Sequence, residues 1–511
     1  MVVAPTGSGK TLAAFLWSLD RLLREPVPDE PLRRCRVVYV SPLKALAVDV
    51  ERNLRAPLVG IGHAAHRLGA PAPEVTVALR SGDTPAADRR AFAKRPSDIL
   101  ITTPESLFLL LTSGAREALA GVETVILDEV HAVAGTKRGA HLAVTLDRLD
   151  ALLERPAQRI GLSATVRPIE EVARYLSGGR PVDIVAPPAE KSWDLEVVVP
   201  IPDMAEIGTA TGDLSGAAAG PERRASIWPH VEERIVDLAA QARSTLIFAN
   251  SRRLAERLTA RLNEIWDERH QLDDSLIDAD KPDTDKSATV GALTAVRPGV
   301  ARTPAQVMAQ AGGSAGAPAV FARAHHGSVS KESRAEIEEA LKSGRLPAVV
   351  ATSSLELGID MGAVDLVIQV ESPPSVASGL QRVGRAGHQV GATSHGVFFP
   401  KYRGDLVQSA VVVERMRAGG IEAMRVPANP LDVLAQQIVA IVALDEWSVS
   451  DLHALLRRWL PRLTADGAAF LVVQKNLGSD SLQRWIGDEL GMPCERYATS
   501  KGFRVLHVTR G

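Results

Sequence analysis

The glycine-rich segment of residues 4–11 constrains the fold of this chain more than any other feature. It reads Ala-Pro-Thr-Gly-Ser-Gly-Lys-Thr, follows the apolar residues Met1 to Val3, and precedes an apolar, helix-like pattern that starts at Leu12. Glycines in such a loop let backbone N–H groups approach phosphate oxygens, and the loop has to connect a buried strand to a helix. The segment therefore predicts a phosphate-binding loop inside an α/β domain.

The residue types of this loop predict how it would bind ATP. Lys10 is expected on the β- and γ-phosphates, and the hydroxyl of Thr11 is expected to face Mg²⁺. An isolated loop of this pattern also arises by chance, so the assignment needs support from the rest of the chain. The expected ATP ligands of the loop are Thr6, Gly7, Ser8, Gly9, Lys10 and Thr11.

An acidic pair, Asp128-Glu129, directly follows the apolar run Thr124 to Leu127. Ligands of open α/β sheets bind at the carboxyl ends of the strands, which is where both carboxylates would lie. Asp128 is expected to hold Mg²⁺, and Glu129 is expected to orient and deprotonate the attacking water. The alternative is a pair of solvated acids at a strand end. The phosphate loop upstream in the same domain argues against this alternative.

The segment of residues 381–388, Gln-Arg-Val-Gly-Arg-Ala-Gly-His, supplies positive charge far downstream. An arginine delivered across a domain cleft stabilises the charge that develops on a transferred phosphoryl group, and it makes hydrolysis depend on closure of the cleft. The alternative is a basic, glycine-punctuated helix start on the surface. Together with the other two motifs, the segment predicts an ATPase with two facing domains.

Composition limits the class of protein. A chain of 511 residues with 45% apolar residues can form about three domains, and a net charge of −2 neither supports nor excludes a nucleic-acid partner. Two cysteines, Cys35 and Cys494, are too few for a disulfide framework and suit a reducing cytoplasm. Neither a signal peptide nor a run of about 18 uncharged apolar residues is present, which argues against a membrane partner.

Short apolar runs alternate with helical patterns, as is typical of parallel α/β units whose strands are covered on both faces. Two stretches interrupt the series, residues 203–225 and residues 267–318, and their composition predicts flexible insertions. The expected strands are residues 37–40, 98–102, 124–127, 159–162, 245–248, 348–351 and 366–369.

The ordered motifs resemble those of superfamily 2 helicases, and more narrowly those of the large helicase-related (Lhr) family. The family assignment rests on Ser-Pro-Leu-Lys-Ala-Leu at residues 41–46, on Asp-Glu-Val-His, and on His388 where many relatives have arginine. The matching segments are residues 4–11, 41–47, 80–84, 102–107, 128–131, 163–165, 248–252, 325–328, 351–360 and 381–388.

The resemblance implies two tandem RecA-like parallel-sheet domains followed by a winged-helix domain. The first would span residues 1–190, the second residues 191–426 with the two insertions, and the winged helix residues 427–511. It also implies that the segment of residues 351–360 contacts the ATP ribose region, that Ser163 and Thr165 couple hydrolysis to domain movement, and that Arg385 is the arginine finger. The other implied nucleotide-side residues are Gln381, Arg382, His388, Gly358, Ile359 and Asp360.

A path for nucleic acid follows from groups that contact phosphates without reading sequence. The candidates offer hydroxyls, backbone amides and cations, although each of them singly is equally explained by a turn or a helix cap. They are Pro42, Lys44, Arg80, Thr103, Thr352 and Ser353. His325-His326 lack a Cys or carboxylate at ligand spacing, so we do not expect a metal there.

After Pro427 the sequence predicts a helix over residues 430–440 and a capped helix over residues 447–456, which resembles a winged helix. The basic and aromatic side chains that follow would either line a nucleic-acid strand or form the solvated basic face of an amphipathic helix; they are Arg457, Arg458, Trp459 and Arg462.

Relative to the family, the chain reads as truncated at both ends. The resemblance implies an ATP-dependent 3′-to-5′ translocase on single-stranded DNA that unwinds DNA or RNA–DNA duplexes in repair. An RNA helicase and a nucleic-acid-binding fragment without motor activity remain alternatives.

Overall fold

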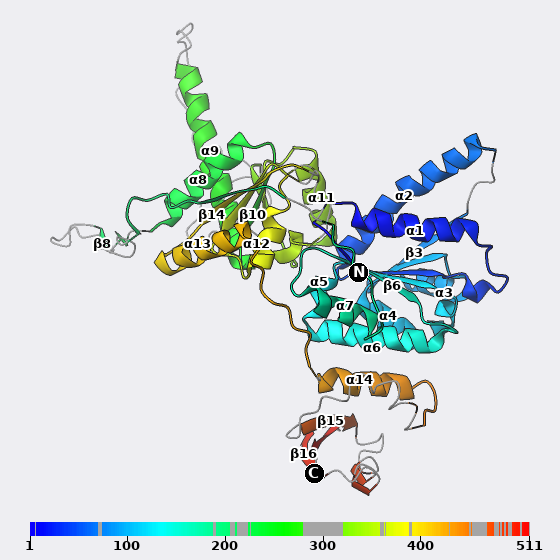
Figure 1. Ribbon diagram of the computed structural model, residues 1–511. Coiled ribbons are helices and arrows are strands. Elements are labelled where there is room, and N and C mark those ends of the chain that lie inside the picture. The colour runs from blue at the N-terminus through cyan, green and yellow to red at the C-terminus, as the bar shows by residue number, and fades with distance from the viewer. Residues whose placement is uncertain are drawn as a thin grey trace, which may run out of the picture. The chain divides into compact units, whose positions relative to one another are not determined.

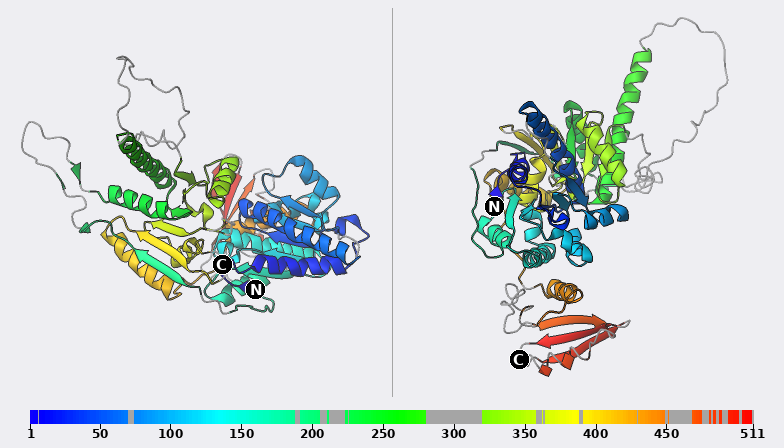
Figure 2. Two further views of the ribbon diagram at one scale, coloured as in Figure 1. Left: turned by 90° about the horizontal axis from the view of Figure 1, so that it is seen from above. Right: turned by 90° about the vertical axis from the view of Figure 1, so that its right-hand side faces the viewer.

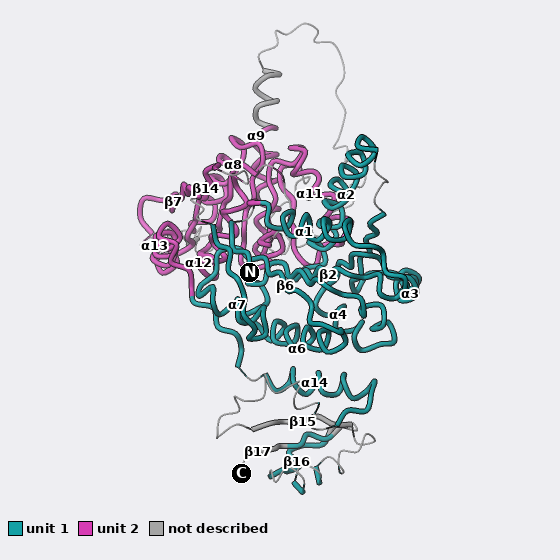
Figure 3. The backbone as a smooth tube through the Cα atoms, turned by 45° about the vertical axis from the view of Figure 1, so that its right-hand side comes forward, with its two compact units in different colours: residues 1–5, 9–188, 423–511 teal, residues 6–8, 189–422 magenta. Residues whose placement is uncertain are grey.

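The computed structural model divides the chain into two compact units, which are described separately here. One consists of residues 1–5, 9–188 and 423–511, and the other of residues 6–8 and 189–422 (Figure 3). The described residues are 1–5, 7–69, 74–187, 191–204, 210–211, 223–224, 226–279, 320–357, 362, 364–387, 391–428, 430–448, 451, 468–474, 480, 483–484, 487–488, 493–500 and 503–509.

The first unit is built on a six-stranded sheet in which every neighbouring pair of strands is parallel. In a parallel sheet all carboxyl ends reach the same edge, so the loops that follow these strands gather there. In spatial order the strands are β1 (Val2–Val3), β6 (Gln158–Ser163), β5 (Thr124–Leu127), β2 (Val37–Val40), β4 (Ile99–Thr102) and β3 (Val77–Arg80).

Helices cover both faces of this sheet because successive side chains of its strands point to opposite faces. Val37 and Tyr39 of β2 pack with α1 and α2, whereas Val38 and Val40 pack with the group that includes α4, α6 and α7 (Figure 1). The helices are α1 (Lys10–Arg24), η1 (Pro31–Arg33), α2 (Lys44–Arg67), α3 (Ala86–Lys94), α4 (Pro104–Leu111), η2 (Gly114–Leu119), α5 (Val130–Ala134), α6 (Lys137–Leu152) and α7 (Ile169–Ser177).

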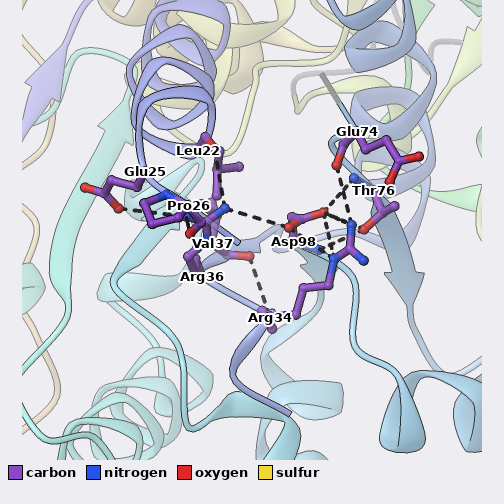
Figure 4. A network of polar contacts seen from close by, with 10 residues as sticks. Leu22, Glu25, Pro26, Arg34, Arg36, Val37, Glu74, Thr76 and Asp98 are labelled. Atoms are coloured by element: carbon purple, nitrogen blue, oxygen red, sulfur yellow. Dashed lines mark hydrogen bonds and ion pairs between the residues drawn. The ribbon is translucent and has the colours of Figure 1, made fainter. Parts of the chain in front are cut away.

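A buried carboxylate ties the amino ends of β2, β3 and β4 together (Figure 4). Asp98, which is 1% exposed, accepts hydrogen bonds from the backbone N–H and the hydroxyl of Thr76, at 2.8 and 2.6 Å, and from Arg34. Arg36 approaches the same carboxylate at 3.8 Å and donates to the carbonyls of Leu22 and Pro26. Because this network lies at the amino edge, it supports the sheet from the side opposite the motifs.

The second unit repeats the plan with another six-stranded, all-parallel sheet. Its spatial order is β11 (Ala322–His325), β12 (Ala348–Ala351), β10 (Thr245–Phe248), β13 (Leu366–Val370), β14 (Ser394–Phe399) and β7 (Trp193–Val197). Its remaining elements are the short pair β8 (Ala210–Thr211) and β9 (Arg223–Arg224), and α8 (Trp228–Gln241), α9 (Arg252–Ala279), α11 (Lys331–Lys342), η4 (Ser353–Leu355), α12 (Val376–Val383) and α13 (Arg403–Arg417).

Helix α9 extends into the range that composition predicted to be a flexible insertion. It is helical through Ala279, and Figure 2 shows its far end extending away from the rest of the second unit. Trp266 stacks on Phe321 with ring centroids 4.5 Å apart and contacts His270, and Arg269 pairs with Asp237 at 2.7 Å. These contacts anchor the helix up to His270. Residues 280–318 lie outside the described residues, as does most of residues 203–225.

All seven strands predicted from apolar runs are confirmed, and Val2–Val3 forms the strand that enters the phosphate loop. Of the described strands in the two six-stranded sheets, four were missed: β3, β7, β11 and β14. Three of these are edge strands and the fourth lies next to an edge. Strands in such positions carry polar residues, such as Arg323 in β11 and Asp194 in β7, and so lack a continuous apolar run.

The C-terminal part of the first unit starts with α14 (Leu431–Val442), which confirms the predicted helix. The Ser448 hydroxyl accepts from the backbone N–H of Asp451 at 3.0 Å, as expected of a cap, but residues 452–467 lie outside the described residues. An antiparallel sheet follows, in the order β15 (Ala468–Gln474), β17 (Phe503–Thr509) and β16 (Cys494–Ser500). Within the described ranges, no helix has the length and apolarity that crossing a lipid bilayer requires.

Candidate nucleotide-binding site

The glycine-rich loop directly precedes α1 at the carboxyl end of β1. Gly9 is the residue before the helix, with φ of 80°, and Gly7 has φ of 83°, both in the left-handed region that glycine adopts at low cost. Lys10 opens the helix, and its Nζ donates to the carbonyls of Ala4 and Pro5 at 2.7 and 2.9 Å. A helix N-terminus with a lysine beside it suits a phosphate group, because the backbone N–H groups of a helix's first turn point outward along its axis. Thr6 lies outside the described residues.

The acidic pair follows β5, two strands from β1, and both side chains are buried, with 6% of Asp128 and 8% of Glu129 exposed. Glu129 has φ of 45°, an unusual conformation for a residue other than glycine, and its backbone N–H donates to Asp128 Oδ1 at 2.8 Å. Burial, together with the neighbouring charge of Glu129, raises the pKa of Asp128 to about 6, while Lys10 acts in the opposite direction. The site thus holds a concentrated negative charge that a cation would neutralise.

Tyr39 of β2 donates its hydroxyl hydrogen to Asp128 Oδ2. The side chain is fully buried, and burial, followed by the charge of Asp128, raises the pKa of Tyr39 well above its ordinary value, so the hydroxyl keeps its proton. No sequence motif pointed to this residue. The available signal was a tyrosine inside a fully buried apolar strand, because a buried hydroxyl needs a hydrogen-bond partner.

His131 connects the acidic motif to the end of β6. The Nδ1 atom of His131 lies 3.0 Å from Ser163 Oγ and 3.3 Å from the backbone nitrogen of Ala164. The same Nδ1 atom lies 3.5 Å from Glu129 Oε2. Ser163 is fully buried and Thr165 is exposed. The acidic motif and the segment of residues 163–165 are therefore in direct contact within the first unit.

The donor set fits Mg²⁺, which takes oxygen ligands and in nucleotide sites keeps several waters and phosphate oxygens besides one or two protein groups. Asp128 offers a buried carboxylate, and Thr11 offers a hydroxyl in the first turn of α1. The lysine, the hydroxyl and the two carboxylates all follow strands β1 and β5 at one sheet edge.

The strand order divides this carboxyl edge into two parts. Strands β1, β6 and β5 lead into the phosphate loop, Ser163 and the acidic pair, whereas β2, β4 and β3 lead into the candidate nucleic-acid residues. Because parallel strands place their carboxyl ends along one edge, the nucleotide-binding candidates and the nucleic-acid candidates form adjacent halves. Sequence order alone interleaves these motifs, and only the strand order separates them.

The four nucleic-acid candidates of the first unit differ in accessibility. Lys44 is exposed and pairs with Asp83 at 2.7 Å, and Arg80 is partly buried. Pro42 is buried and its carbonyl accepts from Arg138 at 2.7 Å. Thr103 is also buried, precedes α4, and donates to Ser106 Oγ at 3.2 Å, which matches the helix-start alternative.

The two arginines of the segment 381–388 lie inside the second unit. Arg382, which is 2% exposed, donates to Glu356 Oε2 at 3.1 Å and to the side-chain oxygens of Asn250 and Gln369 at 3.1 and 3.0 Å. Arg385, 3% exposed, donates to the backbone carbonyl of Glu356 at 3.0 Å.

The partners of these arginines had no role assigned from the sequence. A signal was present in Gln369, a polar residue inside the apolar run of β13. Gln381 is partly buried, and Gly358, Ile359, Asp360 and His388 lie outside the described residues.

The remaining candidates of the second unit follow β11 and β12. Thr352 precedes the 3₁₀ helix η4, which begins at the exposed Ser353. His325 lies 3.0 Å from Glu338 and 2.9 Å from Ser354 Oγ, and His326 lies 2.5 Å from Glu256. Both histidines are thus engaged in hydrogen bonds that hold the strand end.

Three family models match the chain in succession. They are DEAD/DEAH box helicase over residues 1–172, helicase conserved C-terminal domain over residues 315–389, and large helicase-related protein, winged helix domain, over residues 414–472. Two parallel-sheet domains with these motifs at their strand ends, followed by a winged helix, are the architecture of the DEAD/DEAH box helicase class. Within that class, the chain belongs to the large helicase-related (Lhr) family.

Relatives of known name support this assignment. The Lhr helicase/probable uracil glycosylase of Mycolicibacterium smegmatis is 61% identical over 92% of this chain and 29% of the relative. The Lhr helicase/uracil glycosylase of Escherichia coli is 54% identical over 90% of this chain and 29% of the relative. The chain thus spans less than a third of either protein. The solved structure of Mycobacterium smegmatis helicase Lhr bound to ssDNA and AMP-PNP has a TM-score of 0.72 and 58% identity, over 90% of this chain and 51% of that one.

Proposed function

We propose that the chain binds ATP at the carboxyl edge of the first sheet and hydrolyses it to move 3′-to-5′ along single-stranded DNA. The movement would unwind DNA or RNA–DNA duplexes during DNA repair. The observation that carries the proposal is the gathering of Lys10, Asp128 and Glu129 at one sheet edge, where Lys10 acts electrostatically on Asp128. The relative of known structure that binds ssDNA and AMP-PNP supports the choice of ligands.

Each residue has a distinct role in this proposal. The amides that follow Gly7 and Gly9 bind phosphate oxygens, and Lys10 leaves its loop carbonyls to pair with the β- and γ-phosphates. Thr11 and Asp128 would hold Mg²⁺, which supplies charge neutralisation between the phosphates. Glu129 takes the proton of the attacking water, because its carboxylate lies at the same strand end.

The second unit contributes the other half of the proposed cycle. Arg385 would stabilise the charge of the transferred phosphoryl group, with Gln381, Arg382 and His388 as helpers. Gly358, Ile359 and Asp360 would face the ribose. The nucleic acid would follow Pro42, Lys44, Arg80, Thr103, Thr352 and Ser353, and the hydroxyls and cations among them suit backbone contacts. We place the protein in the cytoplasm, where ATP and nucleic acid are both present.

The test is DNA-stimulated ATP hydrolysis by the wild type and by Glu129→Gln. The substitution removes the base and keeps the shape, so we expect turnover to fall by about 10²- to 10⁴-fold while Mg·AMP-PNP binding is retained. Glu170→Gln, an exposed change on α7, is the matched control and should turn over normally. Unchanged turnover in Glu129→Gln would remove the assigned base.

The same assay separates the alternatives. Stimulation by a ribo strand but not by a deoxy strand would favour an RNA helicase. Strand binding without any stimulation of hydrolysis would identify a fragment that binds nucleic acid without motor activity. Unwinding of duplexes with a single-stranded tail at one end or the other then tests the proposed polarity.

A further inference from the structure

Tyr39 occupies a position that reaches two parts of the nucleotide site at once. It lies on β2, next to β5 in the sheet, and its hydroxyl donates to Asp128 Oδ2. Its ring stacks on Phe15 of α1 with centroids 5.1 Å apart and planes 24° from parallel. Phe15 belongs to the helix whose first turn carries Lys10 and Thr11. One buried side chain therefore contacts both elements that would supply Mg²⁺ ligands.

The carboxylate of Asp128 is held through both of its oxygens. Oδ1 accepts the backbone N–H of Glu129 at 2.8 Å, and Oδ2 accepts the Tyr39 hydroxyl. Two donors at opposite oxygens fix the rotation of the carboxylate about its Cβ–Cγ bond. Each oxygen has a second lone pair, so the carboxylate can still bind a cation or its water. Partners of this kind around a metal ligand set its orientation and strengthen metal binding.

We propose that Tyr39 is a positioning residue of the Mg²⁺ site, which orients Asp128 for the cation and keeps the helix carrying Thr11 aligned with it. The inference rests on the proposed ATP function, and it concerns the metal rather than the nucleotide. The hydroxyl of Tyr39 bonds to Asp128 and its ring stacks on Phe15, and both of these partners lie outside residues 4–11. Its loss should therefore weaken the Mg²⁺-dependent part of binding and spare the part that depends on Lys10.

The chain offers a matched control for this proposal. Tyr175 of α7 is also a buried tyrosine in the first unit, but its hydroxyl donates to the backbone carbonyl of Gly139 at 2.9 Å. Tyr39→Phe and Tyr175→Phe each remove one buried hydroxyl and keep the ring. General destabilisation should be similar in the two variants, whereas an effect on Mg²⁺ should appear only in Tyr39→Phe.

The experiment measures thermal unfolding of the wild type and both variants with AMP-PNP present while Mg²⁺ is titrated. We expect the midpoint of the Mg²⁺-dependent rise in Tm to move to about 10-fold higher Mg²⁺ in Tyr39→Phe, and to stay at the wild-type value in Tyr175→Phe. Stabilisation by AMP-PNP in EDTA should be equal in all three proteins. If a variant unfolds at too low a temperature for this assay, Mg²⁺-dependent binding is measured instead at low temperature by the fluorescence of mant-labelled AMP-PNP.

Other outcomes would overturn the inference in distinguishable ways. A wild-type Mg²⁺ midpoint in Tyr39→Phe would show that the hydroxyl does not position the metal ligand. An equal shift in Tyr175→Phe would reduce the effect to loss of a buried hydrogen bond. If the wild type itself showed no stabilisation by Mg·AMP-PNP, the proposed nucleotide site would fail, and the inference would fail with it.

Discussion

Arg148 on α6 donates a hydrogen bond to the side-chain oxygen of Gln437 on α14, over 3.0 Å. The amide nitrogen of Gln437 donates in turn to the carbonyl of His141 and to Thr145 Oγ1, at 3.1 and 3.0 Å. Gln437 is fully buried, and Arg148 is 8% exposed with its guanidinium 5.6 Å from the ring centre of Phe108. The contact fixes α14 in one register on α6, because a shift would leave these polar groups without partners.

Replacing Gln437 with leucine should loosen this contact. Leucine keeps the volume but supplies no acceptor for the buried guanidinium of Arg148, and we expect the free energy of unfolding to fall by about 2–3 kcal/mol. Urea unfolding measures the change, and hydrogen exchange of α14 amides locates it. Gln436→Leu, an exposed neighbour on the same helix, is the control. Equal losses in the two variants would contradict the assigned role of the buried amide.

Asp128→Asn should stabilise the Mg²⁺-free protein at neutral pH. Burial and the charge of Glu129 raise the pKa of Asp128 to about 6 in the folded state, above its unfolded value of about 3.9. The stabilisation from the extra bound proton is fully present below about pH 4, and it is lost as the pH rises through 6. Asparagine avoids the buried charge, so the variant should be more stable than the wild type by about 3 kcal/mol at pH 7.

The measurement is urea unfolding in EDTA across this pH range for both proteins. The difference between them should shrink towards zero from pH 6 to pH 4, where the wild-type carboxyl is protonated. Asp88→Asn, an exposed change, should show no such profile. A difference that did not vary with pH would contradict the raised pKa of Asp128.

Gly9→Ala should strain the phosphate loop without causing a collision. A Cβ at Gly9 would meet no atom within 4 Å, but φ is 80° there, and an L-residue in this conformation costs about 1–2 kcal/mol. We expect lower stability and weaker AMP-PNP binding. Gly60→Ala, in the interior of α2 with equally open surroundings, should instead stabilise by about 0.5–1 kcal/mol. A lower Tm for Gly9→Ala and a higher Tm for Gly60→Ala would support strain from the positive φ at Gly9. A change of Tm in the same direction in both variants would exclude it.

Strands and motif positions were predictable from the sequence where the physical signal is local. A strand buried on both faces must be apolar along its length, so β2, β5, β10 and β12 appear as continuous runs. Edge strands such as β3 and β11 need no such run, and they were missed. The left-handed glycines of the phosphate loop were likewise predictable, since the loop pattern itself requires close backbone approach to a phosphate.

The sequence by itself determined the buried strands of parallel α/β units and the motifs that end them, because hydrophobic periodicity and glycine placement act over a few residues, whereas the division into two sheets was implied by the family resemblance. Only the tertiary structure decided which distant side chains meet. The pairs Tyr39 with Asp128, Arg382 with Glu356, and Arg148 with Gln437 join residues 89, 26 and 289 positions apart. Such contacts depend on strand order and helix packing, which bring residues together irrespective of their separation along the chain.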